Sequence, residues 1–448
     1  MVFSSVIFLF IFLPIVLLAY YLVRGRRAKN IVLVIASFFF YYWGEGELVV
    51  ILAVSVLINY VSGLLLAKTR ESRFGGKPAL AVGIILNLAL LGYFKYFDFV
   101  IQILNSTVHT EIALKGIVLP IGISFFTFQG MTYIIDLYRG RFEPQKNLLK
   151  LALYVVAFPQ MIAGPIVRYK DINEMIDHRE ESVSQFTEGI SRFICGLAKK
   201  VLIANNVAVI CDAIFAAPVD THTAATLWIG ALTYTFQIYF DFSGYSDMAI
   251  GLGRMFGIRI IENFDYPFIA KNITEFWRRW HISLGLWLRD YIYIPMGGNR
   301  KRQMLNVFVV WFLIGFLQGA AWNFIFWGVF FVIIIMIEKK LLNKTLPRWP
   351  RVFQHLYMIV IVMISFMFFR NYNIFQSTSL IGPLSLHYLR SYALIVVVAM
   401  IASTPIPKKI FAHKWIRWFE PIAVGICLIL ATSFLATGNF NPLIYARF

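Results

Sequence analysis

The sequence predicts an all-α, polytopic helical membrane protein with about eleven transmembrane helices and further re-entrant or interfacial helices. Three observations predict this class. Hydrophobic residues make up 59% of the 448 residues and charged residues only 14%. The mean hydropathy is +0.72, and long apolar runs recur along the whole chain. Only helices and closed barrels satisfy backbone polar groups in lipid, and runs of this length are helical.

The apolar runs divide the chain into expected helices. In order they are Val6–Val23, Ile31–Trp43, Leu48–Ala67, Ala79–Phe94 with an aromatic continuation to Leu104, Gly116–Leu137, Leu148–Gly164, Ile190–Phe215, Thr223–Phe242, Leu305–Leu317, Ala321–Ile337, Leu356–Phe369, Tyr392–Ile401 and Pro421–Leu435. Leu148–Gly164 is short and fits a re-entrant or interfacial helix as well as a span. The charged segment Tyr169–Ser184 is expected at a membrane face. No hydrophilic insertion is long enough to fold alone, so residues 1–448 are expected to form a single membrane-embedded domain.

Basic residues set the expected orientation. The net charge is +18, and Lys and Arg cluster in short loops at 24–29, 68–77 and 139–147. The positive-inside rule places these loops in the cytoplasm and the N-terminus outside, and basic loops also meet anionic lipid headgroups. We therefore expect the basic loops to contact membrane lipid, and we expect no binding of nucleic acid. The first apolar run lacks a basic leader and a cleavage site, so we expect an uncleaved helix. The three cysteines are scattered, so no metal site is expected.

The densest charge cluster lies in Asn272–Gly298, NITEFWRRWHISLGLWLRDYIYIPMGG. A charge at the centre of a membrane helix costs about 2.5 to 3.5 kcal/mol, so such clusters mark function or mutual pairing. His281 lies inside the cluster, and an imidazole whose pKa is near neutrality can take a proton from a hydroxyl group. The cations are expected either to steer an anionic substrate or to pair with nearby acids. They are Arg278, Arg279 and Arg289, and the acids within the segment are Glu275 and Asp290.

Three further polar motifs each have two interpretations. In 119–140, Gln129 and Asp136 fall on nearly the same helix face. Either this face belongs to the functional site, or Asp136 is a structural partner of Arg139. In 158–169, Gly164-Pro165 breaks a helix and forms either a simple turn or a pocket wall flanked by Gln160 and Arg168. In 234–254, two acids surround Gly244. Asp241 and Asp247 are either proton-relay or ion ligands, or structural partners of Arg278, Arg279 or Arg289.

Four ordered motifs carry a resemblance to a known family. LPIGISFFTFQGMTYIIDLYRG, FPQMIAGPIVRY, FDFSGYSDMAIGLGRMFGIRIIENFDYPF and EFWRRWHISLGLWLRDYIYIPMGGNR follow one another within a signature core of about 119–322. The chain resembles the membrane-bound O-acyltransferase superfamily, in the bacterial branch of the alginate O-acetyltransferase membrane component. The resemblance covers residues 1 to about 335.

The resemblance implies helices around a central tunnel in a bacterial plasma membrane. Cytoplasmic acetyl-CoA would be the acyl donor, with no other cofactor, and the acetyl group would move toward an extracellular polysaccharide or an extracytoplasmic partner acetyltransferase. His281 matches the first of the two functional histidines of the family. Gln318 stands at the position of the second, the presumed catalytic residue, and an amide cannot act as a general base.

Gln318 leaves three explanations open: a deliberate inactivating substitution, a natural enzyme that uses His281 or another base, or a natural non-catalytic relative. The remaining functional alternatives are a secondary transporter or channel, and a non-catalytic platform for a secreted acetyltransferase. The residues expected to carry catalysis are His281 and the position of Gln318. Those expected to bind substrate are Arg278, Arg279, Trp280, Ser283, Arg289, Asp290, Asp241 and Gln129.

Overall fold

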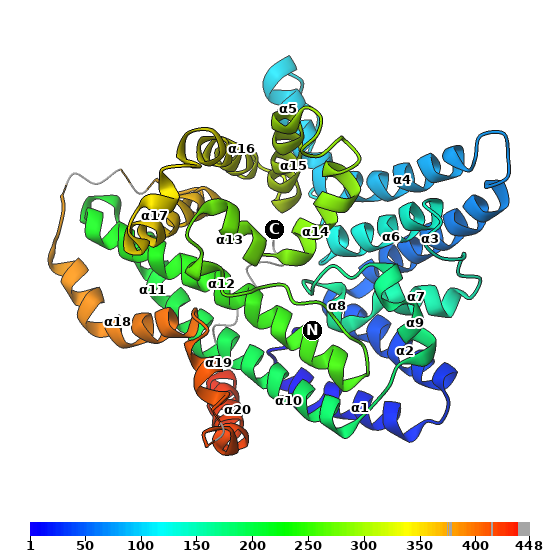
Figure 1. Cartoon of the computed structure of the whole chain (residues 1–448), viewed down its shortest axis with the longest axis horizontal. Coiled ribbons are helices and arrows are strands. Elements are labelled where there is room, and N and C mark those ends of the chain that lie inside the picture. The colour runs from blue at the N-terminus through cyan, green and yellow to red at the C-terminus, as the bar shows by residue number, and fades with distance from the viewer. Residues whose placement is uncertain (374, 376–378, 414, 438–448) are drawn as a thin grey trace. The chain divides into compact units, whose positions relative to one another are not determined.

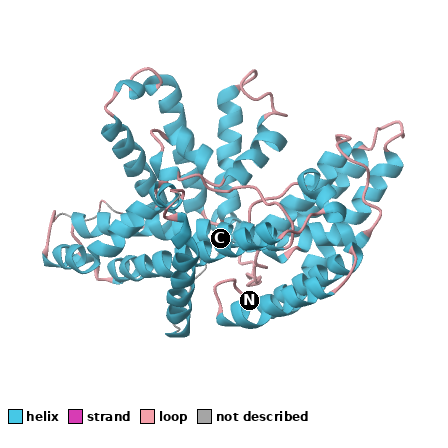
Figure 2. Cartoon of the chain, turned by 60° about the horizontal axis from the view of Figure 1, so that its bottom comes forward, coloured by secondary structure: helices cyan, strands magenta, loops and turns pink. Residues whose placement is uncertain are grey.

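The computed structural model describes residues 1–373, 375, 379–413 and 415–437. Within these ranges the regular structure is entirely helical, and no strand occurs (Figure 2). The chain divides into two compact units. Figure 1 colours the chain by residue number, so the segments of each unit can be found by their colour. The first contains Met1–Phe193 and Met248–Ile261, and the second contains Ile194–Asp247 and the described part of Glu262–Ala446. The all-α prediction is confirmed, whereas the single domain stays a prediction.

The first unit holds the N-terminal helices. They are η1 (Phe8–Phe12), α1 (Leu13–Leu22), α2 (Arg26–Glu45), η2 (Gly46–Leu48), α3 (Val49–Thr69), α4 (Lys77–Leu91), η3 (Gly92–Tyr96), α5 (Phe97–Val108), α6 (Ile123–Tyr138), α7 (Leu148–Val156), α8 (Phe158–Met161), α9 (Tyr169–His178), the first part of α10 (Val183–Ala198) and the last part of α12 (Ala224–Met255). Helices α3, α4 and α6 pack against one another. Small residues permit this approach, because a Cβ at Gly83 would lie 2.9 Å from the Ser62 hydroxyl.

The Glu181 carboxylate contacts several basic groups beside the connection between α1 and α2, which is expected to face the cytoplasm. Glu181 forms ion pairs with Arg26 and, at 2.5 Å, with Lys29. It also accepts a hydrogen bond from the Tyr20 hydroxyl at 2.6 Å and lies 3.8 Å from the buried Arg179. Burial alone would raise the pKa of Glu181, but the hydrogen bonds from Lys29, Tyr20 and Arg26 lower it overall. The cluster therefore holds the segment before α10 against the α1–α2 connection.

The second unit holds the remaining helices. They are the last part of α10, η4 (Lys199–Ala204), α11 (Asn205–Ala216), η5 (Val219–Thr221), the first part of α12, η6 (Pro267–Ile269), α13 (Ile273–Arg279), α14 (Ile282–Leu288), η7 (Arg289–Tyr293), α15 (Gln303–Gln318), α16 (Trp322–Ile337), η8 (Glu338–Leu342), η9 (Leu346–Arg348), α17 (Arg351–Arg370), α18 (Pro383–Ala402), α19 (Ile406–Phe411), η10 (Arg417–Phe419) and α20 (Glu420–Thr437). Helices α15 and α16 pack closely, and α16 also contacts α17 (Figure 1).

Six helical segments of the described chain are long and apolar enough to cross a membrane. They are Arg26–Thr69, Lys77–Val108, Val183–Ala216, Arg351–Arg370, Pro383–Ala402 and Glu420–Thr437. The first of them contains both α2 and α3, which meet at Gly46 with a φ of 58°. The protein is thus a multi-pass membrane protein, while the predicted total of about eleven spans is not confirmed.

Several expected boundaries were wrong: the helix expected from Tyr392 begins at Pro383, the one expected from Ile190 begins at Val183, and two further differences have a clear physical cause. The helix expected from Gly116 begins at Ile123, because Pro120 has no backbone N–H and Gly122 adopts a left-handed φ of 78°. The helix expected to end at Phe242 continues as α12 to Met255. Its acids do not end it, because each has a lysine partner, as described below.

Helix α12 passes very close to the end of α10 in the second unit. A Cβ built at Gly244 would lie 2.7 Å from the backbone oxygen of Gly196 and 3.1 Å from the backbone nitrogen of Lys200. Only glycine fits at that distance, since real Cβ atoms do not approach backbone oxygens so closely. The absence of a side chain at position 244 therefore sets the separation of these two helices.

Candidate active site

The predicted site segment folds into two short helices, α13 and α14, separated by a sharp break. The start of α13 is capped twice: Asn272 Oδ1 accepts from the Glu275 N–H at 2.7 Å, and the Glu338 carboxylate accepts from the Ile273 N–H at 2.6 Å and the Thr274 N–H at 3.0 Å. Both caps satisfy N–H groups that a helix N-terminus leaves open. Glu338 is buried and begins η8, so it fastens α13 to the end of α16.

His281 occupies the break between the two helices. Trp280 is extended, and His281 adopts the left-handed conformation with a φ of 46°. This conformation is uncommon outside glycine. The Ile282 N–H donates to the backbone oxygen of Asn263 at 2.9 Å, which fixes the turn against the segment that follows α12.

The His281 side chain is 4% exposed. The Phe242 ring meets the imidazole edge to face, with 4.7 Å between ring centroids. Burial lowers the pKa of His281 to about 3, because a charged imidazolium loses its hydration there. The expected pKa near neutrality was therefore wrong. A neutral imidazole retains a lone pair that can accept a proton.

Asn263 brings His281 and Ser283 together, and sequence reasoning did not single it out. Its Oδ1 lies 3.1 Å from His281 Nδ1 and accepts from the Ser283 hydroxyl at 2.8 Å and the Ser283 N–H at 3.2 Å. Its Nδ2 donates to the Ser246 hydroxyl at 3.2 Å. Asn263 is fully buried, so the predicted residues His281 and Ser283 share one buried polar centre.

The three predicted arginines differ in their contacts. Arg279 pairs with Asp265 at 2.7 Å and with Glu275 at 3.1 Å. Arg289 pairs with its predicted neighbour Asp290 at 2.7 Å. These two arginines have the expected structural partners.

Arg278 is exposed, and no carboxylate of the described chain lies within ion-pair distance of it. Lys339 of η8 is its charged neighbour. Burial and the nearby charge of Arg278 both lower the pKa of Lys339. Two like charges held close together form a local positive centre, which favours the binding of an anion.

Trp280 lies in an aromatic core. It is 4% exposed, and its ring centroid lies 5.1 Å from that of Phe264 and 5.4 Å from those of Phe276 and Phe366. These contacts join α13 to α17. Packing of this kind immobilises the residue next to His281.

The acids of α12 pair with lysines of η4. Asp241 lies 2.6 Å from Lys200, and each side chain is 2% exposed. Asp247 lies 2.6 Å from the less buried Lys199. Ion pairing was one of the two expected roles, and the structure favours it over an ion pathway. The expected partners were wrong, because arginines of 278–289 had been named and the bases found are lysines.

Gln318 is the last residue of α15 and is 8% exposed. Its position is set by the close packing of α15 on α16. A Cβ at Gly315 would collide with the backbone oxygen of Phe324, and a Cβ at Gly319 would collide with the ring of the same residue. An amide thus occupies the end of a tightly held helix.

Gln129 belongs to α6 of the first unit and is fully buried. Neither polar atom of its amide has a hydrogen-bond partner among the described residues. Asp136, on the same helix, pairs with Arg141 at 2.8 Å and with Arg139 at 3.8 Å. The structural interpretation of Asp136 is confirmed, with Arg141 as the closer base, whereas substrate binding by Gln129 stays a prediction.

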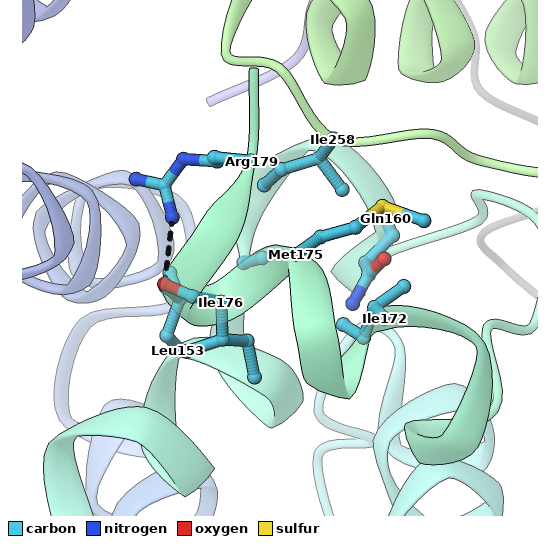
Figure 3. Close-up of a pocket in the computed structure, with 8 residues that line it drawn as sticks. Leu153, Gln160, Ile172, Met175, Ile176, Arg179 and Ile258 are labelled. Carbon is cyan, nitrogen blue, oxygen red and sulfur yellow. Dashed lines mark hydrogen bonds between the residues drawn. The ribbon is translucent and has the colours of Figure 1, made fainter. Parts of the chain in front are cut away.

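One residue of the 158–169 motif lines a small cavity in the first unit (Figure 3). Gln160 lines the cavity and donates to the backbone oxygen of Tyr154 at 2.9 Å. Arg179 also lines it and contacts the backbone oxygen of Ile176. The space measures about 10 Å³, close to the room that one water molecule needs. Gly164, Pro165 and Arg168 do not line this cavity, and it is too small for a substrate, so the structure gives no support to the pocket-wall interpretation.

Sequence reasoning missed Asn263 and Glu338 as parts of the site. Asn263 lies in the NFDYPF stretch, and a single asparagine there carries no spacing signal. Glu338 directly follows an apolar helix and precedes two lysines, so it looks like an ordinary loop residue. Only the fold brings each next to the His281 segment.

Comparisons with known proteins agree on one family. The model of the membrane-bound O-acyltransferase family matches residues 143–381. The protein named "Probable alginate O-acetylase AlgI" of Pseudomonas aeruginosa is 43% identical over 381 residues, which cover 84% of this chain and 73% of the relative. The peptidoglycan O-acetyltransferase of Helicobacter pylori is 34% identical over 84% of this chain and 78% of its own length. The teichoic acid D-alanyltransferase of Bacillus subtilis is 31% identical over 48% of this chain and 58% of its own length.

Proposed function

Because this chain belongs to the membrane-bound O-acyltransferase family, we propose that it moves acetyl groups from cytoplasmic acetyl-CoA toward hydroxyl groups of an extracytoplasmic polysaccharide. The choice of acetyl over other acyl groups rests on the relatives. The two that carry O-acetyl transfer in their names cover 84% of this chain, whereas the D-alanyltransferase covers 48%. Both acetyl-transferring relatives are named for polymer acceptors, and the proposed acceptor is therefore an alginate-like or peptidoglycan-like glycan.

One observation carries the chemistry: His281 is a buried, neutral imidazole held by hydrogen bonds in the segment that resembles the family's functional motif. In the proposed step the acceptor hydroxyl oxygen attacks the carbonyl carbon of the acetyl thioester. His281 takes the hydroxyl proton, the C–S bond breaks, and CoA leaves with that proton as the free thiol. General-base assistance typically contributes about 10²–10⁴ in rate and is greatest when the pKa of the base lies near the operating pH, so the low pKa of His281 limits its strength as a base.

Gln318 supports a different task in the same reaction. Its amide cannot accept the proton, but its N–H groups can donate hydrogen bonds to a thioester carbonyl oxygen as negative charge develops there. A histidine at this position would add a second titratable group. We therefore expect a slow enzyme in which His281 is the base, and a faster one with Gln318→His.

The donor end is proposed to lie near Arg278 and Lys339. The phosphates of CoA are anionic, and these two cations form the positive centre described above. The segment 339–351 that follows is rich in Lys and Arg, and the positive-inside rule places such a segment in the cytoplasm, where acetyl-CoA is available. We propose the plasma membrane of a bacterium as the location and an extracytoplasmic acetyltransferase as the partner that completes transfer to the glycan.

The test is release of free CoA and acetylation of an alginate oligosaccharide by the purified protein in detergent. Four forms are compared: the protein as it stands, Gln318→His, and each of these with His281→Ala. His387→Ala, at an exposed position of α18, is the matched control. We expect His281→Ala to lower CoA release about 10²–10⁴-fold and His387→Ala to leave it unchanged. Equal CoA release with and without His281 would overturn the assignment of the base.

A second candidate function rests on Gln318 alone. A chain that lacks the second histidine could serve as a membrane platform that positions a secreted acetyltransferase. The same four forms decide between the two: a platform releases no CoA in any form, yet glycan acetylation in cells persists when His281 is replaced.

A further inference from the structure

The buried amide of Asn263 has an orientation that its neighbours determine. Amide oxygen and nitrogen are distinguished by their hydrogen-bond partners. A backbone N–H can only donate, and the Ser283 N–H points at the atom 3.2 Å away, so that atom is Oδ1. The opposite atom, Nδ2, then donates to the Ser246 hydroxyl at 3.2 Å.

This orientation decides the tautomer of His281. Because Oδ1 carries no hydrogen, the contact of 3.1 Å with His281 Nδ1 requires the hydrogen on Nδ1. In a neutral imidazole the other nitrogen, Nε2, then holds the lone pair. Burial lowers the pKa of His281 to about 3, so the ring is neutral at physiological pH.

Asn263 also holds the backbone of the histidine. Its own carbonyl oxygen accepts from the Ile282 N–H at 2.9 Å, directly after the left-handed His281. One residue thus fixes both the unusual backbone turn and the ring that projects from it. Asn263 is fully buried, and competition from water for these contacts is small.

We infer that Asn263 is a positioning residue for acyl transfer, which holds His281 in the Nδ1–H tautomer and so keeps the lone pair on Nε2, the nitrogen that would take the proton in the proposed step. The inference rests on the proposed function for its catalytic consequence and on the geometry alone for the tautomer. It has the logic of a base oriented by a third group, in which the wrong tautomer disables the base although the residue is intact.

Nitrogen NMR of protein labelled with ¹⁵N-histidine measures the tautomer without any need for activity. The chain has seven histidines, and His281→Gln identifies the signal of interest by its loss. We expect His281 to carry its hydrogen on Nδ1 in the unaltered protein. A hydrogen on Nε2 in that spectrum overturns the inference, even if the protein transfers acetyl groups.

Two variants separate positioning from mere packing. Asn263→Leu keeps the volume but removes the acceptor, and we expect loss of the fixed Nδ1–H tautomer and CoA release about 10²–10⁴-fold slower. Asn263→Asp keeps the acceptor, so the Nδ1–H tautomer is retained. Its negative charge raises the pKa of His281, and the acidic limb of the pH–rate profile moves to higher pH because the protonated ring cannot act as base.

Asn306→Asp is the matched control, because Asn306 is a buried asparagine of the same unit whose Nδ2 donates to the backbone oxygen of Gly298 at 2.8 Å. It should alter neither the tautomer nor the pH profile. If Asn263→Leu does not fold, Asn263→Asp decides: an unmoved acidic limb or a lost Nδ1–H tautomer contradicts the positioning role. Absence of CoA release from every form rejects the proposed function but leaves the tautomer measurement decisive for Asn263.

Discussion

The ion pair between Lys200 and Asp241 offers a quantitative test of how this fold tolerates charge inside the second unit. Each side chain is 2% exposed and the charged atoms lie 2.6 Å apart. Lys200 also donates to Asn205 at 3.0 Å. The perturbations are Asp241→Leu, Lys200→Met and the two together.

At 2.6 Å and an effective dielectric constant of about 20, the gross attraction between unit charges is about 6 kcal/mol. Most of this attraction is offset by the cost of removing both charges from water. Loss of one partner leaves the other charge buried and uncompensated, which costs about 3–5 kcal/mol of folding free energy. Replacement of both by apolar side chains of similar size removes both desolvation costs, so we expect the double variant to lie within about 2 kcal/mol of the unaltered protein.

The assay is unfolding by sodium dodecyl sulfate in mixed micelles, followed by tryptophan fluorescence, for the single and double variants. The control is Glu188→Gln, which breaks the exposed pair with Arg254, whose side chains are 56% and 39% exposed, and which should cost at most about 1 kcal/mol. If Asp241→Leu costs no more than the control, the pair is not a buried charge pair in solution. If the double variant is as unstable as the sum of the single ones, the reasoning about desolvation fails.

Three further predictions follow from described contacts. Protonation of His281 should not reduce CoA release between pH 8 and pH 5, because a pKa of about 3 keeps the ring neutral over that range. A decline with a midpoint near pH 6.5 that disappears in His281→Gln would refute this prediction. Glu181→Gln should lower the stability of the folded protein at neutral pH. The difference from the unaltered protein should disappear as pH falls through the depressed pKa of Glu181, because a carboxyl group whose folded pKa is lowered stabilises the fold only while it is ionised. Thermal unfolding between pH 7 and pH 3 measures this difference. Gly244→Ala should lower the free energy of unfolding by about 1–3 kcal/mol, because its Cβ would lie 2.7 Å from the Gly196 oxygen. Gly92→Ala is the control, because a Cβ there meets open space, and it should not destabilise the protein. Equal unfolding midpoints for the two variants would show that α10 and α12 separate easily.

The class of fold was predictable because hydrophobicity alone requires membrane helices in a chain of this composition. Helix ends were predictable where the apolar run itself ends, as at α15, which was expected over Leu305–Leu317 and spans Gln303–Gln318, and were missed where other signals compete. The run from Gly116 is apolar enough for a span, yet Pro120 and Gly122 prevent a helix there. At Phe242 the apolar run ends, but helix α12 continues, and its acids Asp241 and Asp247 pair with lysines from elsewhere in the chain.

The candidate site was predictable in its location and not in its internal contacts. A cluster of charges within apolar sequence marks His281 by composition, and the resemblance marks the position of Gln318. The pKa of His281 and the role of Asn263 depend on burial and on distances between side chains that are 18 residues apart. No sequence spacing encodes such a contact in a loop, so the contact between Asn263 and His281 can be found only from the fold.

The pairing of η4 with α12 also bears on how the chain enters the membrane. Lys199 and Lys200 precede Asp241 and Asp247 in synthesis, and each charge alone costs about 2.5–3.5 kcal/mol at the centre of an inserting helix. The helices that carry them are connected through α11 and a short loop. If the two segments enter the membrane as one hairpin, the opposite charges meet before lipid surrounds either helix. The two segments should therefore integrate well only in each other's presence, and a ribosome stalled before Asp241 should leave the first of them poorly inserted.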